Sequence, residues 1–235
     1  MTLKSETKPS LENILGLTAF AAGAVDIISF TKLGGVFSSA MTGNLAFLAL
    51  YLARFSFLSA LGSFIALLGF VVGGAIGTLL GRGRAQHAAL RVLLGCETLL
   101  LAGAVALWLA VPHGNGSLNT DALIMLLSVS MGLQSIVGKR VNLSNIPTVV
   151  FTSTLTNIVI ALTDMLASGT YALPKDTKRQ CASFLLYFFG ALCAGVVVYF
   201  KVPGLIFLPV LAVGTAFVVE LAIGEQETIS KQPIE

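Results

Sequence analysis

The sequence has few charged residues and few side chains that bind metal ions or form disulfides. Charged residues make up 11% of its 235 residues, compared with about 25% in a typical soluble domain. The two histidines, His87 and His113, lie far apart, and the three cysteines show no paired spacing. These absences argue against a metal site and a disulfide, and we expect no metal and no cofactor.

Motifs for phosphate binding and nucleophilic catalysis are also absent from the sequence. No glycine-rich loop carries the lysine of an ATP-binding site, and no serine and histidine form a recognisable catalytic set. The net charge of +3 is spread over the loops, so it bears on membrane orientation rather than on nucleic-acid binding. We therefore expect neither an enzyme nor an ATP-driven pump, and no nucleic-acid partner.

Hydrophobic residues are abundant instead, and they occur in long runs. They make up 56% of the chain, and the mean hydropathy is +0.92. A soluble chain of this length cannot bury so much apolar surface, whereas a membrane-spanning helix needs roughly 20 apolar residues. Four runs reach that length: Leu11–Phe30, Phe57–Leu80, Leu90–Val111 and Cys181–Phe200. The sequence therefore predicts an all-α, polytopic membrane protein whose main partner is the lipid bilayer.

Polar breaks divide the chain into eight apolar stretches, which predict six to eight membrane segments. The second and sixth stretches both open with small and hydroxylated residues, and Thr42 and Leu45 align with Thr152 and Leu155. Two repeats of about 110 residues would explain this alignment, and internal repeats are common in small transporters. The stretches cover residues 11–31, 36–53, 57–80, 90–111, 121–138, 146–167, 180–200 and 203–222. The predicted parts are a cytoplasmic tail (1–10), a membrane repeat (11–111), a polar loop (112–120), a second membrane repeat (121–222) and a C-terminal tail (223–235).

The distribution of lysine and arginine tests how many of these stretches cross the membrane. If all eight cross, the 14 basic residues divide evenly between the two sides, although cytoplasmic loops normally carry an excess. If the second and sixth stretches are re-entrant or broken, six crossings remain and both termini are cytoplasmic. Only Lys32, Arg54 and Lys201 then lie outside, and the second repeat is inverted relative to the first. Seven crossings place 10 basic residues inside and 4 outside, so charge leaves both of these arrangements open.

Asp26 is the most unusual polar residue of the first repeat, because it lies well inside an apolar run. A carboxylate in the middle of a membrane costs at least about 2.5–3.5 kcal/mol unless it is paired, hydrated or protonated. One interpretation is a proton, cation or ligand site, and the other is a structural hydrogen bond to the loop that contains Thr42. For Glu97, in the fourth stretch, a functional site and a side chain that reaches the interface both remain open.

The segment Thr42-Gly43-Asn44 combines a hydroxyl, a residue without a side chain and an amide. This combination is typical of a helix start or an unwound turn, where Thr and Asn can cap the helix and Gly allows close approach. A helix that starts inside the membrane also presents N–H groups that suit an anion or a polar ligand. In the second repeat, Thr152 and Thr154 offer similar chemistry, and Gln134 takes the place of Asp26. The predicted solute- or ion-binding residues are Asp26, Thr42, Gly43, Asn44, Gln134, Thr152 and Thr154.

Glycines recur at every fourth position of the third stretch. Gly69, Gly73, Gly77 and Gly81 line one face of the predicted helix with hydrogen atoms, which allows another helix to approach closely. We expect this face to pack against a second helix, either within the fold or between the two subunits of a homodimer.

Two parts of the sequence resemble a known family. Gly23–Asp26 and Gly34–Asn44, which ends in Met-Thr-Gly-Asn, are similar to the first motif of the YoaK family, bacterial inner-membrane proteins that form a domain of unknown function. Gly132–Gln134 and Thr152–Thr154 are similar to its second motif, where Thr-Gly-Thr is more usual, so Ser153 is a departure that weakens the inference of close backbone approach there. The resemblance extends over about residues 15–220 and implies a multi-pass protein of the bacterial inner membrane.

The repeat, the polar interrupted stretches and Asp26 together favour a secondary transporter or facilitator of a small polar solute. The solute or ion would bind near the middle of the membrane, with Asp26 as a proton-coupling or ligand-binding group. Two alternatives remain open, a channel with the same re-entrant halves and a membrane scaffold whose polar residues only pack.

Overall fold

The chain folds entirely into helices over the residues that the structure describes. The structure is a computed structural model, and it describes residues 7–112, 114, 116–141, 151–169, 173–202, 204 and 206–229. Within these ranges there are eight helices and no strand, as predicted for an all-α membrane protein. They are α1 (Thr7–Lys32), α2 (Met41–Ala53), α3 (Phe57–Gly81), α4 (Gln86–Ala110), α5 (Leu118–Val141), α6 (Phe151–Ser168), α7 (Lys175–Tyr199) and α8 (Phe207–Ile229).

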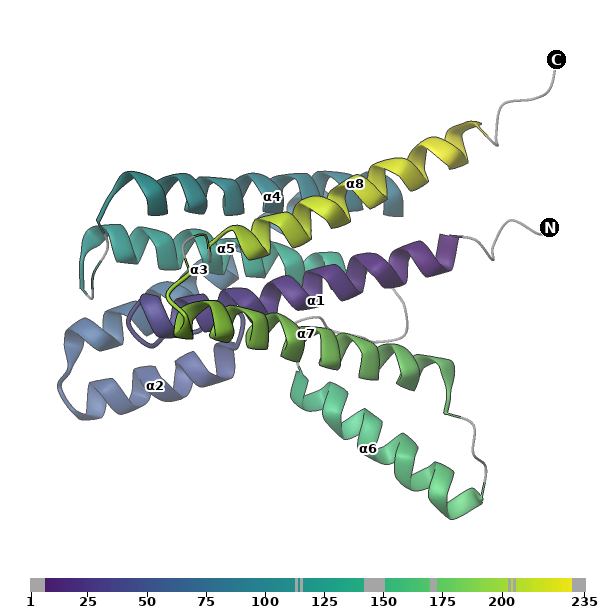
Figure 1. The fold of residues 1–235 in the computed structure, drawn as a ribbon, viewed down its shortest axis with the longest axis horizontal. Coiled ribbons are helices and arrows are strands. Elements are labelled where there is room, and N and C mark those ends of the chain that lie inside the picture. The colour runs from purple at the N-terminus through teal and green to yellow at the C-terminus, as the bar shows by residue number, and fades with distance from the viewer. Residues whose placement is uncertain are drawn as a thin grey trace.

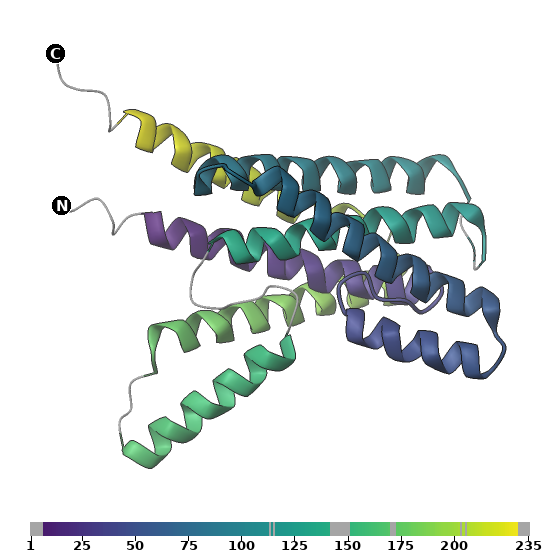
Figure 2. The same cartoon turned by 180° about the vertical axis from the view of Figure 1, so that it is seen from behind.

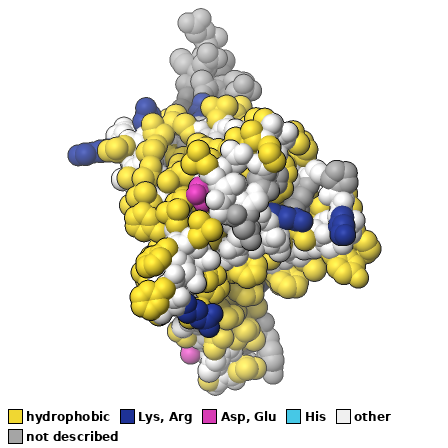
Figure 3. Space-filling view, turned by 90° about the vertical axis from the view of Figure 1, so that its left-hand side faces the viewer, with side chains coloured by type: hydrophobic (Ala, Val, Ile, Leu, Met, Phe, Trp, Pro, Cys, Tyr) yellow, Lys and Arg dark blue, Asp and Glu magenta, His cyan; other side chains and the backbone are white. Residues whose placement is uncertain are grey.

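Five helices are long and apolar enough to cross a membrane: α1, α3, α4, α5 and α7. The apolar part of α8, Phe207–Ile223, is shorter, but the whole helix has 23 residues. By contrast, the 13 residues of α2 extend only about 20 Å, less than the roughly 30 Å of a hydrocarbon core. Large hydrophobic side chains such as Leu79, Leu99 and Leu166 are exposed along the helices, which suits contact with lipid. Figure 3 views the end of the molecule opposite the termini, where Lys and Arg side chains stand among hydrophobic ones.

Contacts between the long helices fix their directions. Helices α1 and α7 are parallel, because Glu12 pairs with Arg179 near one end and Asp26 bonds Tyr187 further along. Helices α4 and α5 are antiparallel, since Gln86 at the start of α4 bonds the last residues of α5. Both chain termini lie at one end of the molecule, the terminal end, as Figure 1 shows. The five long apolar helices and α8 each run from this end of the molecule to the opposite end or back.

Neither α2 nor α6 adds a crossing. Helix α1 finishes at the opposite end and α3 starts there, so α2 leaves and returns on that side (Figure 1). Likewise α5 finishes and α7 starts at the terminal end, where α6 also finishes. These helix directions agree with the predicted arrangement of six crossings, and α2 and α6 open to opposite ends of the molecule.

Two helix crossings are built on glycine, and they have the same construction. A Cβ atom on Gly23 of α1 or on Gly190 of α7 would clash with a backbone carbonyl of the other helix. The same holds between α3 and α5. In all four cases the obstructing carbonyl belongs to the residue three positions before the partner glycine: Phe20 before Gly23, Tyr187 before Gly190, Phe70 before Gly73 and Val129 before Gly132. Glycine is required at these points because the backbones touch.

The glycine-lined face of α3 packs inside the chain. Gly69, Gly73, Gly77 and Gly81 are all buried against α5. A homodimer formed through this face is therefore excluded, because α5 already occupies it.

Helices α2 and α6 lie on the same side of the long helices, toward opposite ends of the molecule. Figure 2, the view from behind, shows α6 at the lower left, whereas α2 lies at the lower left in Figure 1.

Candidate functional site

The loop between α1 and α2 folds back into the membrane region alongside α1. Gly34 and Gly35 have φ angles of 88° and 79°, a region that glycine adopts without strain, and they reverse the chain after α1. The Oδ1 atom of Asp26 then accepts hydrogen bonds from the amides of Ser38 (3.0 Å) and Ser39 (2.7 Å). Because Asp26 lies six residues before the end of α1, the loop returns by about 9 Å before α2 begins. Helix α2 therefore begins beside α1 and not beyond its end.

Both carboxylate oxygens of Asp26 accept hydrogen bonds, and these bonds hold the loop against α1. Its Oδ2 atom accepts hydrogen bonds from the hydroxyls of Ser39 (2.6 Å) and Tyr187 (2.8 Å), and the side chain is only 1% exposed. Four donors of this kind offset the cost of burying a carboxylate. Of the two interpretations of Asp26, the contacts favour the structural one, although the loop residues are Ser38 and Ser39 rather than Thr42. Tyr187 comes from α7, 161 residues away.

Asn44 holds the same loop from the other side. Its Oδ1 atom accepts a hydrogen bond from the amide of Phe37 (2.9 Å), and its Nδ2 atom donates to the carbonyl of Phe37. The N-cap of α2 is Ala40, which makes no side-chain capping bond, so the expectation that Thr42 or Asn44 caps the helix is wrong. Gly43 leaves room for Phe37, whose ring would lie 3.2 Å from a Cβ atom there.

The remaining predicted site residues lie elsewhere. Gln134 on α5 donates to the carbonyl of Thr18 (2.8 Å), which is eight residues, or about 12 Å, along α1 from Asp26. Gly23 and Gly132 each lie at a close helix crossing, and the residue three positions after each is Asp26 and Ser135, respectively.

The hydroxylated residues lie on the two re-entrant helices. Thr42 is exposed on α2, while on α6 Thr152 is exposed and Thr154 is buried. Residues 146–150, which open the sixth predicted stretch, lie outside the described residues. The structure therefore brings Asp26 and Asn44 together around one loop, whereas Gln134, Thr152 and Thr154 belong to α5 and α6.

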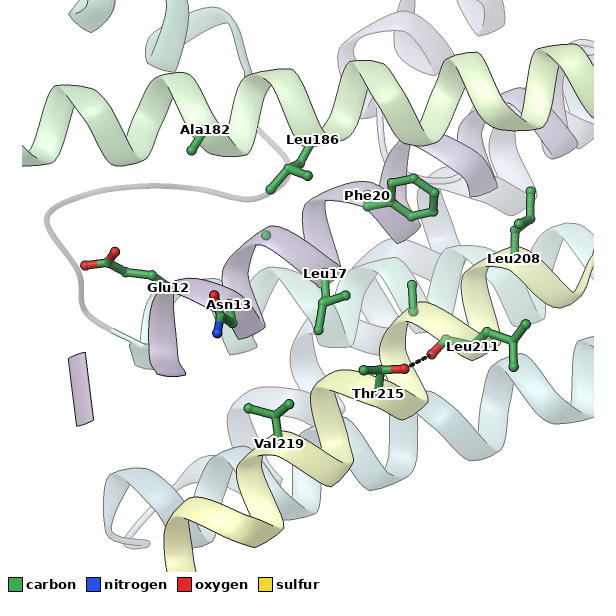
Figure 4. Close-up of a pocket in the computed structure, with 12 residues that line it drawn as sticks. Glu12, Asn13, Leu17, Phe20, Ala182, Leu186, Leu208, Leu211, Thr215 and Val219 are labelled. Carbon is green, nitrogen blue, oxygen red and sulfur yellow. Dashed lines mark hydrogen bonds between the residues drawn. The ribbon is translucent and has the colours of Figure 1, made fainter. Parts of the chain in front are cut away.

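Two cavities adjoin these elements. A cavity of about 730 Å³ lies between α1, α7 and α8, and Figure 4 shows its largely apolar lining, with Glu12, Asn13 and Thr215 among the polar side chains. A smaller one, about 70 Å³, adjoins the re-entrant loop at Gly34 and Val36. Its other walls include Thr120 and Asp121 of α5. The smaller cavity connects the loop with polar groups near the opposite end.

Comparison with known proteins gives the family. The model of a family described as "Protein of unknown function (DUF1275)" matches residues 14–219, which is most of the chain. The chain belongs to the DUF1275 family. One relative is UPF0700 transmembrane protein YoaK of Bacillus subtilis (strain 168), which is 29% identical over 185 residues, or 76% of this chain and 80% of the relative. No solved structure matches. The resemblance to the YoaK family is confirmed, and with the apolar helices it makes this chain a multi-pass integral membrane protein.

Proposed function

We propose that this member of the DUF1275 family is a secondary transporter or facilitator of a small polar solute in a bacterial inner membrane, rather than an enzyme or a scaffold. The observation that carries the proposal is the pair of helices α2 and α6, which open to opposite ends of the molecule. Broken helices at the interface of two inverted repeats form the solute sites of many transporters.

The start of α2 offers suitable chemistry for a polar solute. It lies inside the membrane region, and its first amides carry the positive end of the helix dipole. Thr42 is exposed beside it, while Asp26 and Asn44 fix the loop that leads to it. In this account Thr42 contacts the solute, and the other two residues position the backbone.

Reciprocal contacts support the inverted repeats. If α1 to α4 are matched in order with α5 to α8, the crossing of α1 with α7 corresponds to the crossing of α5 with α3. The contact between α4 and α8 is reciprocal. Gly95 of α4 faces Phe217 of α8, and Gly214 of α8 faces Thr98 of α4, so each helix contributes a glycine and the residue three positions after it. Such exchange symmetry is the relation that alternating access requires.

Basic residues support a cytoplasmic terminal end. Nine basic residues of the described ranges lie at or near helix ends there, whereas Lys32, Arg54 and Lys201 lie at the opposite end. The excess favours the terminal end as the cytoplasmic one. The nine are Lys8, Arg82, Arg84, Arg91, Lys139, Arg140, Lys175, Lys178 and Arg179.

Flux in proteoliposomes tests the proposal, with urea, glycerol and acetate as probes. We expect the wild-type protein to speed the entry of at least one probe over protein-free liposomes, with a rate that saturates. Thr42→Trp should bring the rate close to that of protein-free liposomes, because it places a large side chain at the start of α2. Leu50→Trp introduces the same side chain at an exposed position further along the same helix, and as the control it should leave the rate unchanged.

Three results would contradict this function. Rates equal to those of protein-free liposomes for all three probes, with folded protein in the membrane, would favour a scaffold. A rate that rises linearly with probe concentration would instead indicate a channel. Equal loss in Thr42→Trp and Leu50→Trp would remove the start of α2 from the solute path.

A further inference from the structure

Glu97 is buried at the middle of α4 without a hydrogen-bond partner. It is the twelfth of the 25 residues of this helix, and its side chain is 0% exposed. Neither carboxylate oxygen has a partner among the described residues. Glu97 lies on the same buried stripe as Leu94 and Leu101, so it does not reach the membrane interface.

The register between α4 and α5 places a second buried polar group at the same level. Gln86 donates to the carbonyls of Arg140 (3.0 Å) and Val141 (3.1 Å). Glu97 lies eleven residues after Gln86 on α4. Ser130 lies eleven residues before Val141 on the antiparallel α5, so the two residues are at the same level. Ser130 is also 0% exposed, and its hydroxyl has no partner in the described part of the chain.

Gln134, one turn from Ser130, adds a third group. Its Nε2 atom donates to the carbonyl of Thr18, which places the side chain against α1. Its Oε1 atom is buried and has no partner within the described ranges. Helices α4 and α5 therefore hold five buried oxygen atoms without partners among the described residues, two on Glu97 and one each on Ser128, Ser130 and Gln134. Gln134 connects this region to α1.

Helix packing alone does not require a carboxyl group here. The reciprocal contacts of Gly95 with Phe217 and of Gly214 with Thr98 align α4 with α8. In this alignment the position that corresponds to Glu97 is Ala216, which is equally buried. The methyl group of Ala216 is thus sufficient for packing at this position of α8, whereas α4 has a glutamate at the corresponding position.

The charged groups on the neighbouring helices lie away from Glu97. On α8, Glu220 bonds His87 at 2.8 Å, and Asp26 on α1 is hydrogen-bonded to the re-entrant loop. Arg91 lies six residues, or about 9 Å, along α4 toward the terminal end. On α5, Asp121 and the pair Lys139 and Arg140 each lie at least nine residues from Ser130. Among the described residues no ion pair involves Glu97.

We propose that Glu97, with Ser130 and Gln134 beside it, is an exchangeable proton-binding site in the middle of the membrane. An isolated carboxylate in this position is costly, and a proton neutralises it without a further ligand. The protonated carboxyl group becomes a donor, and the Ser130 hydroxyl and the Gln134 carbonyl oxygen are acceptors on the adjacent helix. Only an O–H bond forms and breaks. The proposal does not rest on the transport function, because proton binding is measured without flux.

Infrared spectroscopy of the purified protein in lipid tests this site through the C=O stretching band of protonated carboxylic acids. We expect a band in the wild-type spectrum that is present in acidic buffer and lost in alkaline buffer. Because the chain has 11 Asp and Glu residues, the contribution of Glu97 is the difference between the wild-type and Glu97→Gln spectra, and this component should titrate. Glu12→Gln makes the same change at a partly exposed residue paired with Arg179, and it should keep this component. Ser130→Ala should shift the pH at which half of this component is lost, because it removes an acceptor.

Four outcomes would overturn the proposal. Identical titrating bands in the wild type and in Glu97→Gln would show that Glu97 does not contribute, and a Glu97 component that persists in alkaline buffer would mark a fixed structural acid. Loss of this component when sodium replaces a large organic cation would indicate a metal-cation site instead. If Glu97→Gln does not fold, Ser130→Ala provides the test, and an unchanged titration in that variant would contradict the site.

Discussion

Asp26 collects four donors from two parts of the chain. Three come from Ser38 and Ser39 in the re-entrant loop, and the fourth is the hydroxyl of Tyr187 on α7. The carboxylate therefore connects α1, the loop and α7 at a single point. In this account its primary role at the residue scale is to hold the loop in the membrane region.

Asp26→Ala should destabilise the protein more than Tyr187→Phe. The first change leaves two buried amides without their acceptor, at roughly 1–3 kcal/mol each, and the second removes one hydrogen bond to a charged group, worth about 1.5–3 kcal/mol. Thermal unfolding in detergent measures both changes. Thr42→Val, at an exposed position on α2, should melt like the wild type. An unchanged melting temperature in Asp26→Ala, combined with lost flux, would show that Asp26 serves the solute or an ion instead.

At the scale of elements, the two glycine crossings determine how closely the long helices approach. Hydropathy predicted the long helices, and the four-residue spacing predicted a packing face on α3. The sequence does not predict α5 as the partner helix, because a glycine pattern contains no information about which helix packs against it. The α1–α7 crossing was missed, since Gly23 and Gly190 are single glycines whose role appears only when the two helices meet.

Gly73→Ala should destabilise the fold, while Gly74→Ala should not. A Cβ atom on Gly73 clashes with the carbonyl of Val129, whereas one on Gly74 would lie 3.9 Å from its nearest neighbour. Overpacking of this kind typically costs about 1–3 kcal/mol. Melting temperatures of the two variants in detergent provide a comparison between adjacent residues of the same helix. Gly190→Ala should behave like Gly73→Ala, and equal stability of Gly73→Ala and Gly74→Ala would contradict the described crossing.

At the scale of the whole molecule, the topology was more predictable than the site. The distribution of basic residues indicated six crossings as one of two arrangements, because loop charge depends only on which side each loop occupies. The partners of Asp26 and the depth of Glu97 were not predictable, since both depend on contacts between distant helices. Its place in an apolar run predicts that Gln134 corresponds to Asp26. An alignment of Gly23 with Gly132 pairs Asp26 with Ser135 instead.

The central claim is that α2 and α6 are re-entrant and open to opposite sides of the membrane. Cysteine accessibility tests it most directly, in a background where Cys96, Cys181 and Cys193 are replaced by alanine. Single cysteines are placed at Thr42 and Ala53, at the two ends of α2, at Ala167 near the end of α6, and at Arg84 as a marker of the terminal end.

A membrane-impermeant maleimide is applied to intact cells and to inverted vesicles. We expect Ala53→Cys to react only from outside, and Ala167→Cys and Arg84→Cys to react only from the cytoplasmic side. Thr42→Cys should not react from the cytoplasmic side. Reaction of Thr42→Cys and Ala53→Cys from opposite sides, or of Ala53→Cys and Ala167→Cys from the same side, would contradict the account.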